Sequence, residues 1–439
     1  MSLDTDKIER QQNITSIKWN KIFALILFLY ALLEFTPIYP RLNTVYLGFL
    51  TILSMVIYIF GYKKILFDIH NAEVYLFLFF WLAISLLSVL WAKNAKAVLS
   101  YSILIAHYIP IFLIFSTFFM NLKNQRNLVI FYQFIALAYL GISVWELISG
   151  NHLPGSKHYG EVYPIPSGPF YSENMLAAFW LILVPYLMVP SWLNKGYILG
   201  TITLLCTIGI YLIIILQSAR IAIIALAVAF LIYLVTWASN KIRISFLLII
   251  ILIPLYFSHF QPNIWLFVKG YTESQLQSLH NESESAEIGS IQIRIHLIKE
   301  GIDMLVGKGL VGVGSGNFEE EMSHGRSIRT GNIINPHSYG VEILSSFGLI
   351  VFLGFLYMYL FWIVSLWKLM KKCSEEMKPF YRANFLSLLM FLPASSLPSS
   401  IRIYFLVWIY FAGIHSTCIR GNEIFAKNTF SSNKLNNSD

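Results

Sequence analysis

Twelve long apolar segments run through this chain of 439 residues, and they restrict its fold more than any other feature. A helix needs about 20 apolar residues to cross a bilayer, and inside lipid every backbone group must find its hydrogen bond within the segment. We therefore predict an all-α polytopic membrane protein with about 12 transmembrane helices. The segments cover roughly residues 22–39, 43–62, 74–91, 98–120, 127–149, 175–193, 196–216, 221–239, 244–260, 343–367, 383–399 and 404–418.

The composition excludes the soluble classes of protein. Hydrophobic residues make up 57% of the chain and charged residues 12%, whereas about a quarter of a soluble domain is charged. Cys206, Cys373 and Cys418 lie outside the external loops and show no Cys/His spacing typical of a metal site, so we expect neither a disulfide nor a metal. The polar stretch before the first segment lacks a small-residue cleavage site, which predicts a retained helix rather than a signal peptide.

The distribution of Lys and Arg predicts the orientation in the membrane. With a cytoplasmic N-terminus, the cytoplasmic segments hold 19 of these residues and the external segments 12, of which 6 lie in one long loop where the rule is weak. We expect both termini to be cytoplasmic, with the basic connection 368–382 as the strongest anchor. The net charge of +8 then reflects topology rather than a nucleic-acid-binding surface.

A large external loop divides the chain. We expect helices 1–9 in residues 1–260, the loop in 261–342 between helices 9 and 10, helices 10–12 in 343–418 and a cytoplasmic tail in 419–439. A loop of this length is unusual unless it has its own structure and function. Residues 291–306 carry apolar side chains at helical spacing, which predicts an amphipathic helix at the membrane surface.

Ionisable side chains on the predicted outer face are candidates for chemistry, because charge is unfavourable near the membrane interior. Arg220 lies in a tight hairpin, where an interfacial anchor that reaches the lipid headgroups is the simpler interpretation. Arg294 lies on the amphipathic segment, and His337 follows an Asn-Pro pair at a helix start; taken singly, each is more often structural. The other candidates are Glu342, Glu34, Glu146 and Arg402.

A glycine-rich turn, Gly312-Val313-Gly314-Ser315-Gly316-Asn317-Phe318, lies between these candidates. It departs from the G-x-G-x-x-G fingerprint, and no βαβ pattern surrounds it, which argues against a dinucleotide-binding domain. Two interpretations stay open: a tight external turn, or a close backbone approach to a diphosphate.

The order of these features resembles the O-antigen ligase and Wzy-type polysaccharide polymerase family over roughly residues 169–369. Before the sixth segment, the family pattern is Phe-x-Asn-Pro-Asn-x-x-Ala. Phe170, Asn174 and Ala177 match it, while Ser172 and Glu173 replace its Asn-Pro.

The later family motifs follow in the same order. A Ser-Arg pair, here with an inserted alanine, ends at Arg220, and the arginine of the family's loop helix corresponds to Arg294. The glycine-rich turn matches the pattern Gly-x-Gly-x-Gly-Asn-Phe. The closing pattern is matched by His337, Glu342 and Gly348, with Ser338 in place of an asparagine.

This resemblance implies a membrane glycosyltransferase that inverts the anomeric centre and needs no metal or cofactor. Its donor would be a glycan on undecaprenyl diphosphate, at the external face of the bacterial plasma (inner) membrane, and its acceptor a glycan or a lipid-linked glycan. Arg220 and Arg294 are expected to hold the leaving diphosphate, because guanidinium groups bind its oxygens bidentately. His337 is expected to act as the base, with Glu342 orienting it. Substrate contacts are expected from Glu342, Asn174, Gly314, Gly316 and Asn317.

Three functions stay open from the sequence. The first is a polymerase that joins lipid-linked repeat units into a capsular, teichuronic-acid-like or O-antigen polysaccharide, together with other polysaccharide-assembly proteins. The second is a ligase that transfers the glycan to a lipid A core. The third is a transporter or flippase for a lipid-linked sugar, against which stand the single long external loop and the missing internal repeat.

Overall fold

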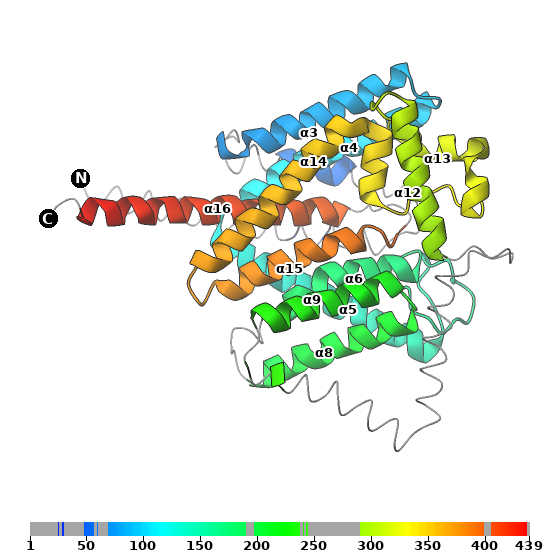
Figure 1. Cartoon of the computed structure of the whole chain (residues 1–439). Helices are drawn as coiled ribbons and strands as arrows, with labels where there is room; N and C mark the ends of the chain where they lie inside the picture. The colour runs from blue at the N-terminus through cyan, green and yellow to red at the C-terminus, as the bar shows by residue number, and fades with distance from the viewer. Residues whose placement is uncertain are drawn as a thin grey trace.

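A computed structural model describes residues 25, 29, 48–56, 59, 69–189, 197–237, 240, 243–244, 290–398 and 405–436. Within these residues all regular structure is helical (Figure 1). The membrane-length elements and their neighbours are α3 (Ile69–Leu87), η1 (Ser88–Leu90), α4 (Ala95–Phe118), α5 (Leu122–Ser149), α6 (Glu173–Leu187), α8 (Tyr197–Leu216) and α9 (Arg220–Thr236). After these come α12 (Ser290–Gly307), α13 (Phe318–Glu321), η2 (Met322–Arg326), η3 (Ser327–Thr330), α14 (Tyr339–Lys372), α15 (Lys378–Ala394) and α16 (Phe405–Asn436).

The helical membrane fold predicted from the sequence is confirmed. Four helices within the described residues are long and apolar enough to cross a bilayer: Ala72–Leu90, Ala95–Phe118, Leu122–Ser149 and Tyr339–Lys372. Of the other predicted spans, 175–193, 196–216 and 221–239 correspond to shorter apolar helices, 383–399 to most of α15 and 404–418 to part of α16. The predicted spans 22–39 and 244–260 lie mostly outside the described residues, as does half of 43–62. The count of twelve spans therefore stays a prediction.

Two helical elements refine the expected boundaries. The amphipathic segment predicted at 291–306 is the helix α12. The last helix, α16, continues to Asn436 and so includes most of the segment expected to be a tail.

Local sequence explains where α4 and α5 begin and end. The side chain of Asn94 accepts a hydrogen bond from the amide of Ala97 at 3.0 Å, and Asn121 caps α5 by accepting from the amide of Lys123 at 2.9 Å. Asn is among the preferred N-cap residues because its side chain satisfies an amide that has no helical partner. Gly150 ends α5 in the left-handed conformation with φ 68°, which glycine adopts without steric cost.

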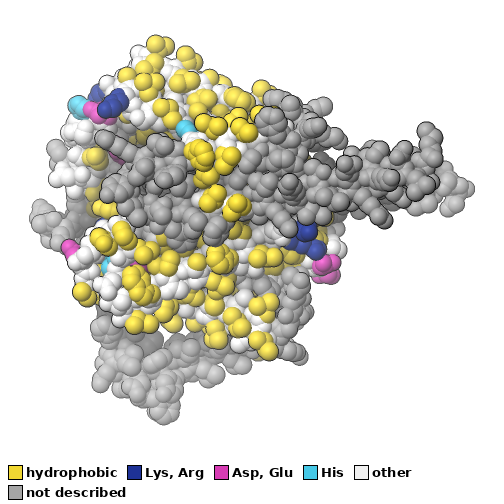
Figure 2. Space-filling model, turned by 180° about the vertical axis from the view of Figure 1, so that it is seen from behind, with side chains coloured by type: hydrophobic (Ala, Val, Ile, Leu, Met, Phe, Trp, Pro, Cys, Tyr) yellow, Lys and Arg dark blue, Asp and Glu magenta, His cyan; other side chains and the backbone are white. Residues whose placement is uncertain are grey.

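The flank of the helical bundle is apolar. In Figure 2 hydrophobic side chains are spread over the described part of the visible face, and the few described charged side chains lie towards its left and right edges. Along α9, for example, Ile224, Leu231 and Val235 are 64%, 57% and 65% exposed. Such a continuous apolar surface would be unstable in water but suits the hydrocarbon core of a bilayer.

The connections sort into two groups at opposite ends of the bundle. The segment 150–172, the α8–α9 hairpin, α12, α13 and the start of α14 lie at the right-hand end in Figure 1, whereas the α14–α15 connection lies at the left-hand end. Between them α6 packs against α15, and α4 packs against both α3 and α16. The candidate residues that the structure describes therefore share one end of the molecule.

The glycine-rich turn is bonded into a break in α14. Gly348 has φ 85° and ψ 175°, which interrupts the helical hydrogen-bond ladder. The carbonyls of Ser345 and Ser346 instead accept from the amides of Val313 at 2.8 Å and Gly314 at 3.1 Å. In exchange, the amide of Leu349 donates to the carbonyl of Leu310 at 2.9 Å. This exchange joins the α12–α13 connection to the first turns of α14.

Gly312 makes the closest approach in this joint, so Gly312→Ala tests it. A Cβ atom at Gly312 would lie 2.7 Å from both the Gly348 nitrogen and the Ser345 oxygen, and the residue has φ 80°. We expect the substitution to destabilise the protein by roughly 2–4 kcal/mol, because backbone strain and overpacking add. The measurement is the melting temperature in detergent.

The control for this experiment is Gly307→Ala. Gly307 is the last residue of α12, five residues before Gly312, but a Cβ atom there would meet nothing within 4 Å. We expect Gly307→Ala to leave the melting temperature nearly unchanged. Equal stability of the two variants would show that the joint does not hold the fold.

Candidate active site

His337 lies in the short segment between η3 and α14, in a conformation that is rare for a residue with a side chain. Its φ is 45°, in the left-handed region, and two residues later the amide of Tyr339 donates to the carbonyl of Ser395 at 3.2 Å. Strained backbone of this kind often occurs at functional sites. The Nδ1 atom of His337 is buried and has no hydrogen-bond partner within the described residues. An imidazole nitrogen is therefore available to a bound group.

The structure brings Arg294 to this imidazole. Burial, and then the positive charge of Arg294, lower the pKa of His337 to about 4, against a smaller opposing effect of the backbone carbonyl of Leu397. Burial also lowers the pKa of Arg294, although arginine stays charged at neutral pH. At neutral pH the site thus presents an uncharged imidazole beside a half-buried guanidinium.

Helix packing explains how Arg294 reaches His337. Gly301 lies two helical turns beyond Arg294, on the same face of α12, and a Cβ atom there would lie 2.5 Å from Val341 in the first turn of α14. Leu297, on that face, is fully buried in a small core with Phe318. The close approach of α12 to α14 therefore brings Arg294 near enough for its charge to act on His337.

Arg220 lies at the start of α9, at the same end of the bundle (Figure 1). The hairpin before it has Ser218 at φ 52°, and Gln217 Nε2 donates to the carbonyl of Pro166 at 2.8 Å. The side chain of Arg220 is exposed and makes no hydrogen bond or ion pair with any described residue. Among the described residues, no contact joins Arg220 to His337.

Glu342 is buried, with 2% of its surface exposed, in the first turns of α14. It lines a pocket of about 340 Å³ together with Trp81, Tyr108, Tyr339 and Trp408. Its expected roles, to orient the imidazole of His337 and to contact the substrate, stay predictions.

The motif before α6 contributes both core and surface residues. Phe170 and Ala177 are buried, and the ring of Phe170 stacks on Phe179 with centroids 4.6 Å apart. Asn174 is the second residue of α6, is partly exposed, and its side chain makes no hydrogen bond with a described residue. Its amide is available to a ligand at the end of the bundle where Arg220 lies.

The residues of the glycine-rich turn make protein contacts. A Cβ atom at Gly314 would lie 2.5 Å from Ala92, and one at Gly316 would lie 2.5 Å from the ring of Tyr101. Asn317 is fully buried and accepts from the amide of Asn94 at 2.7 Å. Of the two interpretations of the turn, the geometry favours a structural joint, so we leave Gly314, Gly316 and Asn317 out of the proposed chemistry.

Glu146 is also hydrogen-bonded within the protein. Its carboxylate accepts from the backbone amides of Ser167 at 2.9 Å and Gly168 at 2.7 Å, and lies 3.1 Å from Nδ1 of His152. This fully buried carboxylate organises the segment 150–172, which in turn supports the α8–α9 hairpin. The other two candidates, Glu34 and Arg402, lie outside the described residues.

Two ion pairs that the sequence pattern does not predict hold the segment between α12 and α14. Glu321 pairs with Lys93 at 2.8 Å, and Glu300 pairs with Arg326 at 2.9 Å. Both pairs join residues far apart in the chain, so no local pattern in the sequence indicates them. Within the described ranges, no group of three or more His, Cys, Asp or Glu residues is arranged to hold a metal ion.

Comparison with known proteins agrees with the motifs. Residues 202–356 match the sequence model of a family described as O-antigen ligase. The chain is also 29% identical to the teichuronic acid biosynthesis protein TuaE of Bacillus subtilis (strain 168), over 355 residues that cover 77% of this chain and 70% of that protein. The family resemblance inferred from the motifs is confirmed.

The charge of Arg294 can be tested directly on His337. In Arg294→Gln the pKa of His337 should rise above about 4, because the guanidinium no longer opposes protonation. Arg294→Lys keeps a positive charge and should leave the pKa low. The measurement is the pH dependence of the histidine ring ¹⁵N shifts, assigned with His337→Gln. A wild-type pKa near 6.5, or no change in Arg294→Gln, would contradict the arrangement.

Proposed function

We propose that this membrane protein, whose residues 202–356 match the O-antigen ligase family model, polymerises glycan repeat units carried on undecaprenyl diphosphate. The product is a cell-surface polysaccharide. The observation that carries the proposal is the uncharged imidazole of His337 beside the guanidinium of Arg294, at the end of the bundle that also holds Arg220. We further propose that this end faces the outside and that both termini are cytoplasmic, from the Lys and Arg distribution.

In the proposed reaction a hydroxyl of the acceptor sugar attacks the anomeric carbon of the donor. A new glycosidic bond forms, the bond from that carbon to the diphosphate oxygen breaks, and the configuration inverts. The hydroxyl proton goes to His337, and the lipid diphosphate leaves with the electron pair. Arg294 and Arg220 neutralise the charge that develops on it, a role for which two guanidinium groups are suited without a metal.

The low pKa of His337 has a consequence for this mechanism. An imidazole with a pKa of about 4 is free to accept a proton at neutral pH, but it is a weak base. A diphosphate bound at Arg294 offsets the positive charge that helps to lower this pKa, so donor binding raises the basicity of His337. The base thus becomes stronger when the donor is in place.

The choice between polymerase and ligase rests on the comparisons. The matched family is described as O-antigen ligase, which favours a ligase that transfers glycan to a lipid A core. The similar Bacillus protein is described by teichuronic acid biosynthesis, which favours a polymerase. The polymerase is our first choice because that likeness covers 77% of this chain. The family match also argues against a transporter.

The acceptor decides between the two reactions. Purified protein is given a defined lipid-linked repeat unit, with either a second donor molecule or a lipid A core as acceptor, in detergent and without an ion gradient. We expect elongation of the lipid-linked glycan, and the same rate in EDTA. Transfer only to the lipid A core would make the protein a ligase, and no transfer to either would refute a glycosyltransferase.

Substitutions test the assigned roles in the same assay. We expect His337→Ala to lower kcat by about 10²–10⁴-fold, because general-base catalysis contributes about that much. Arg294→Ala and Arg220→Ala should each lower it by about 10²–10³-fold, as for lost electrostatic stabilisation. Each variant must be expressed and folded at the wild-type level.

Two surface residues serve as controls. His324 is an exposed histidine of the same external segment, and Lys299 is an exposed cation on α12. His324→Ala and Lys299→Ala should keep kcat within about twofold of the wild type. Full activity in His337→Ala would refute its role as the base.

A further inference from the structure

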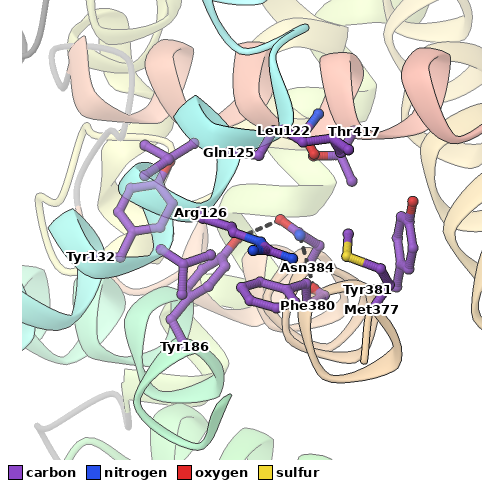
Figure 3. Close-up of a pocket in the computed structure, with 12 residues that line it drawn as sticks. Leu122, Gln125, Arg126, Tyr132, Tyr186, Met377, Phe380, Tyr381, Asn384 and Thr417 are labelled. Carbon is purple, nitrogen blue, oxygen red and sulfur yellow. Dashed lines mark hydrogen bonds between the residues drawn. The ribbon is translucent and has the colours of Figure 1, made fainter. Parts of the chain in front are cut away.

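A pocket of about 400 Å³ lies far from His337, between the starts of α5 and α15 and the side of α16 (Figure 3). The helix α5 has 28 residues and ends at Ser149, beside the external segment. At 1.5 Å per residue it is about 42 Å long, so the pocket at its start lies near the other surface of a bilayer. The basic connection 368–382, predicted to be cytoplasmic, runs beside it.

The polar groups of this pocket that lack partners are hydrogen-bond donors. Tyr132 is 4% exposed, and its hydroxyl has no hydrogen-bond partner among the described residues. The Nε2 atom of Gln125 is also buried without a partner there. By contrast, Tyr186 donates to Asn384 Oδ1 at 2.9 Å. A buried polar group without a partner costs free energy, so these two donors indicate a ligand with acceptor oxygens.

The electrostatics of the pocket favour an anion. None of the residues that line it is Asp or Glu, and Arg126 stands among them. The long helices α5 and α15 both begin here, so the positive ends of two helix dipoles lie at the pocket. Arg126 pairs with Glu376 at 3.1 Å, but the two side chains are 51% and 72% exposed. Such an exposed pair is weak, and a bound anion can compete for the guanidinium.

The rest of the pocket wall is apolar. It is formed by Leu122, Leu128, Val129, Met377 and the ring of Phe380, over which the Arg126 guanidinium lies at 5.9 Å. A ligand that suits both parts has an anionic headgroup joined to hydrocarbon. An ordinary water-soluble phosphate compound would leave the apolar wall without a partner.

We infer that this pocket binds the phosphate of an anionic phospholipid from the leaflet opposite to the active site. The hydroxyl of Tyr132, the amide of Gln125 and the guanidinium of Arg126 donate to the phosphate oxygens, and the acyl chains lie on the apolar wall. This inference does not depend on the proposed glycosyltransferase activity.

Lipid binding to the purified full chain tests the inference. Dioleoylphosphatidylglycerol, dioleoylphosphatidylcholine and inorganic phosphate are titrated separately, and affinity is read from native mass spectrometry and from the rise in melting temperature. We expect phosphatidylglycerol to bind about tenfold more tightly than phosphatidylcholine. Tyr132→Phe, which deletes only the hydroxyl, and Arg126→Gln should each weaken phosphatidylglycerol binding by about tenfold.

The matched control is Tyr410→Phe. Tyr410 is 3% exposed, on α16, but it does not line this pocket. Its variant should bind phosphatidylglycerol within twofold of the wild type. Arg126 lies on the surface, so Arg126→Gln gives a test even if Tyr132→Phe fails to fold.

Three results would overturn the inference. Unchanged phosphatidylglycerol binding in both pocket variants would remove the assigned donors. Equal affinity for phosphatidylcholine would show that the negative charge is not recognised. Stabilisation by inorganic phosphate equal to that by phosphatidylglycerol would make the ligand a soluble phosphate rather than a lipid.

Discussion

The exchange of backbone hydrogen bonds between the glycine-rich turn and α14 is the interaction on which the candidate site depends. At Gly348 the helical hydrogen bonds of α14 are interrupted, and the carbonyls of Ser345 and Ser346 accept hydrogen bonds from amides of the turn instead. Only glycine allows this approach, because the backbones of Gly312 and Gly348 leave no room for a Cβ atom. The joint ties the end of α12 to the start of α14, and so it fixes the helix that carries Arg294 relative to the segment that carries His337.

The two ends of the bundle carry different arrangements of charged and polar groups. At the end with His337, burial of the imidazole and then the charge of the half-buried Arg294 lower the pKa of His337, so the imidazole is uncharged at neutral pH. A protonated His337 and Arg294 would repel each other. An uncharged imidazole can instead accept a proton from an acceptor hydroxyl while the guanidinium stabilises a leaving anion. At the other end, Arg126 and two buried donors face an apolar pocket, an arrangement that suits a lipid phosphate. An apolar flank between the ends keeps both within one membrane-embedded bundle.

Buried carboxylates show why charge alone is a poor guide to chemistry. Glu146 and Glu342 were both candidates because a carboxylate near the membrane is costly. Glu146 is satisfied by two backbone amides and by His152, so it stabilises the segment 150–172. The glycine-rich turn gives the same lesson, because most of its amides, which resemble an anion cradle in the sequence, bond to the protein itself.

The sequence by itself determined the helical membrane fold, the amphipathic helix at 290–307 and the order of the family motifs, because apolar length, helical period and motif spacing are local properties. It also indicated Arg294 and His337 as candidates, though not that the charge of one would act on the other. Only the tertiary structure decided that the charge of Arg294 acts on His337 and that Glu146 is bonded to backbone amides of the protein. It also decided that Ala92 and Tyr101 occupy the space beside Gly314 and Gly316. Several of these facts depend on contacts between segments more than two hundred residues apart. A local sequence pattern does not indicate which side chains such contacts will bury.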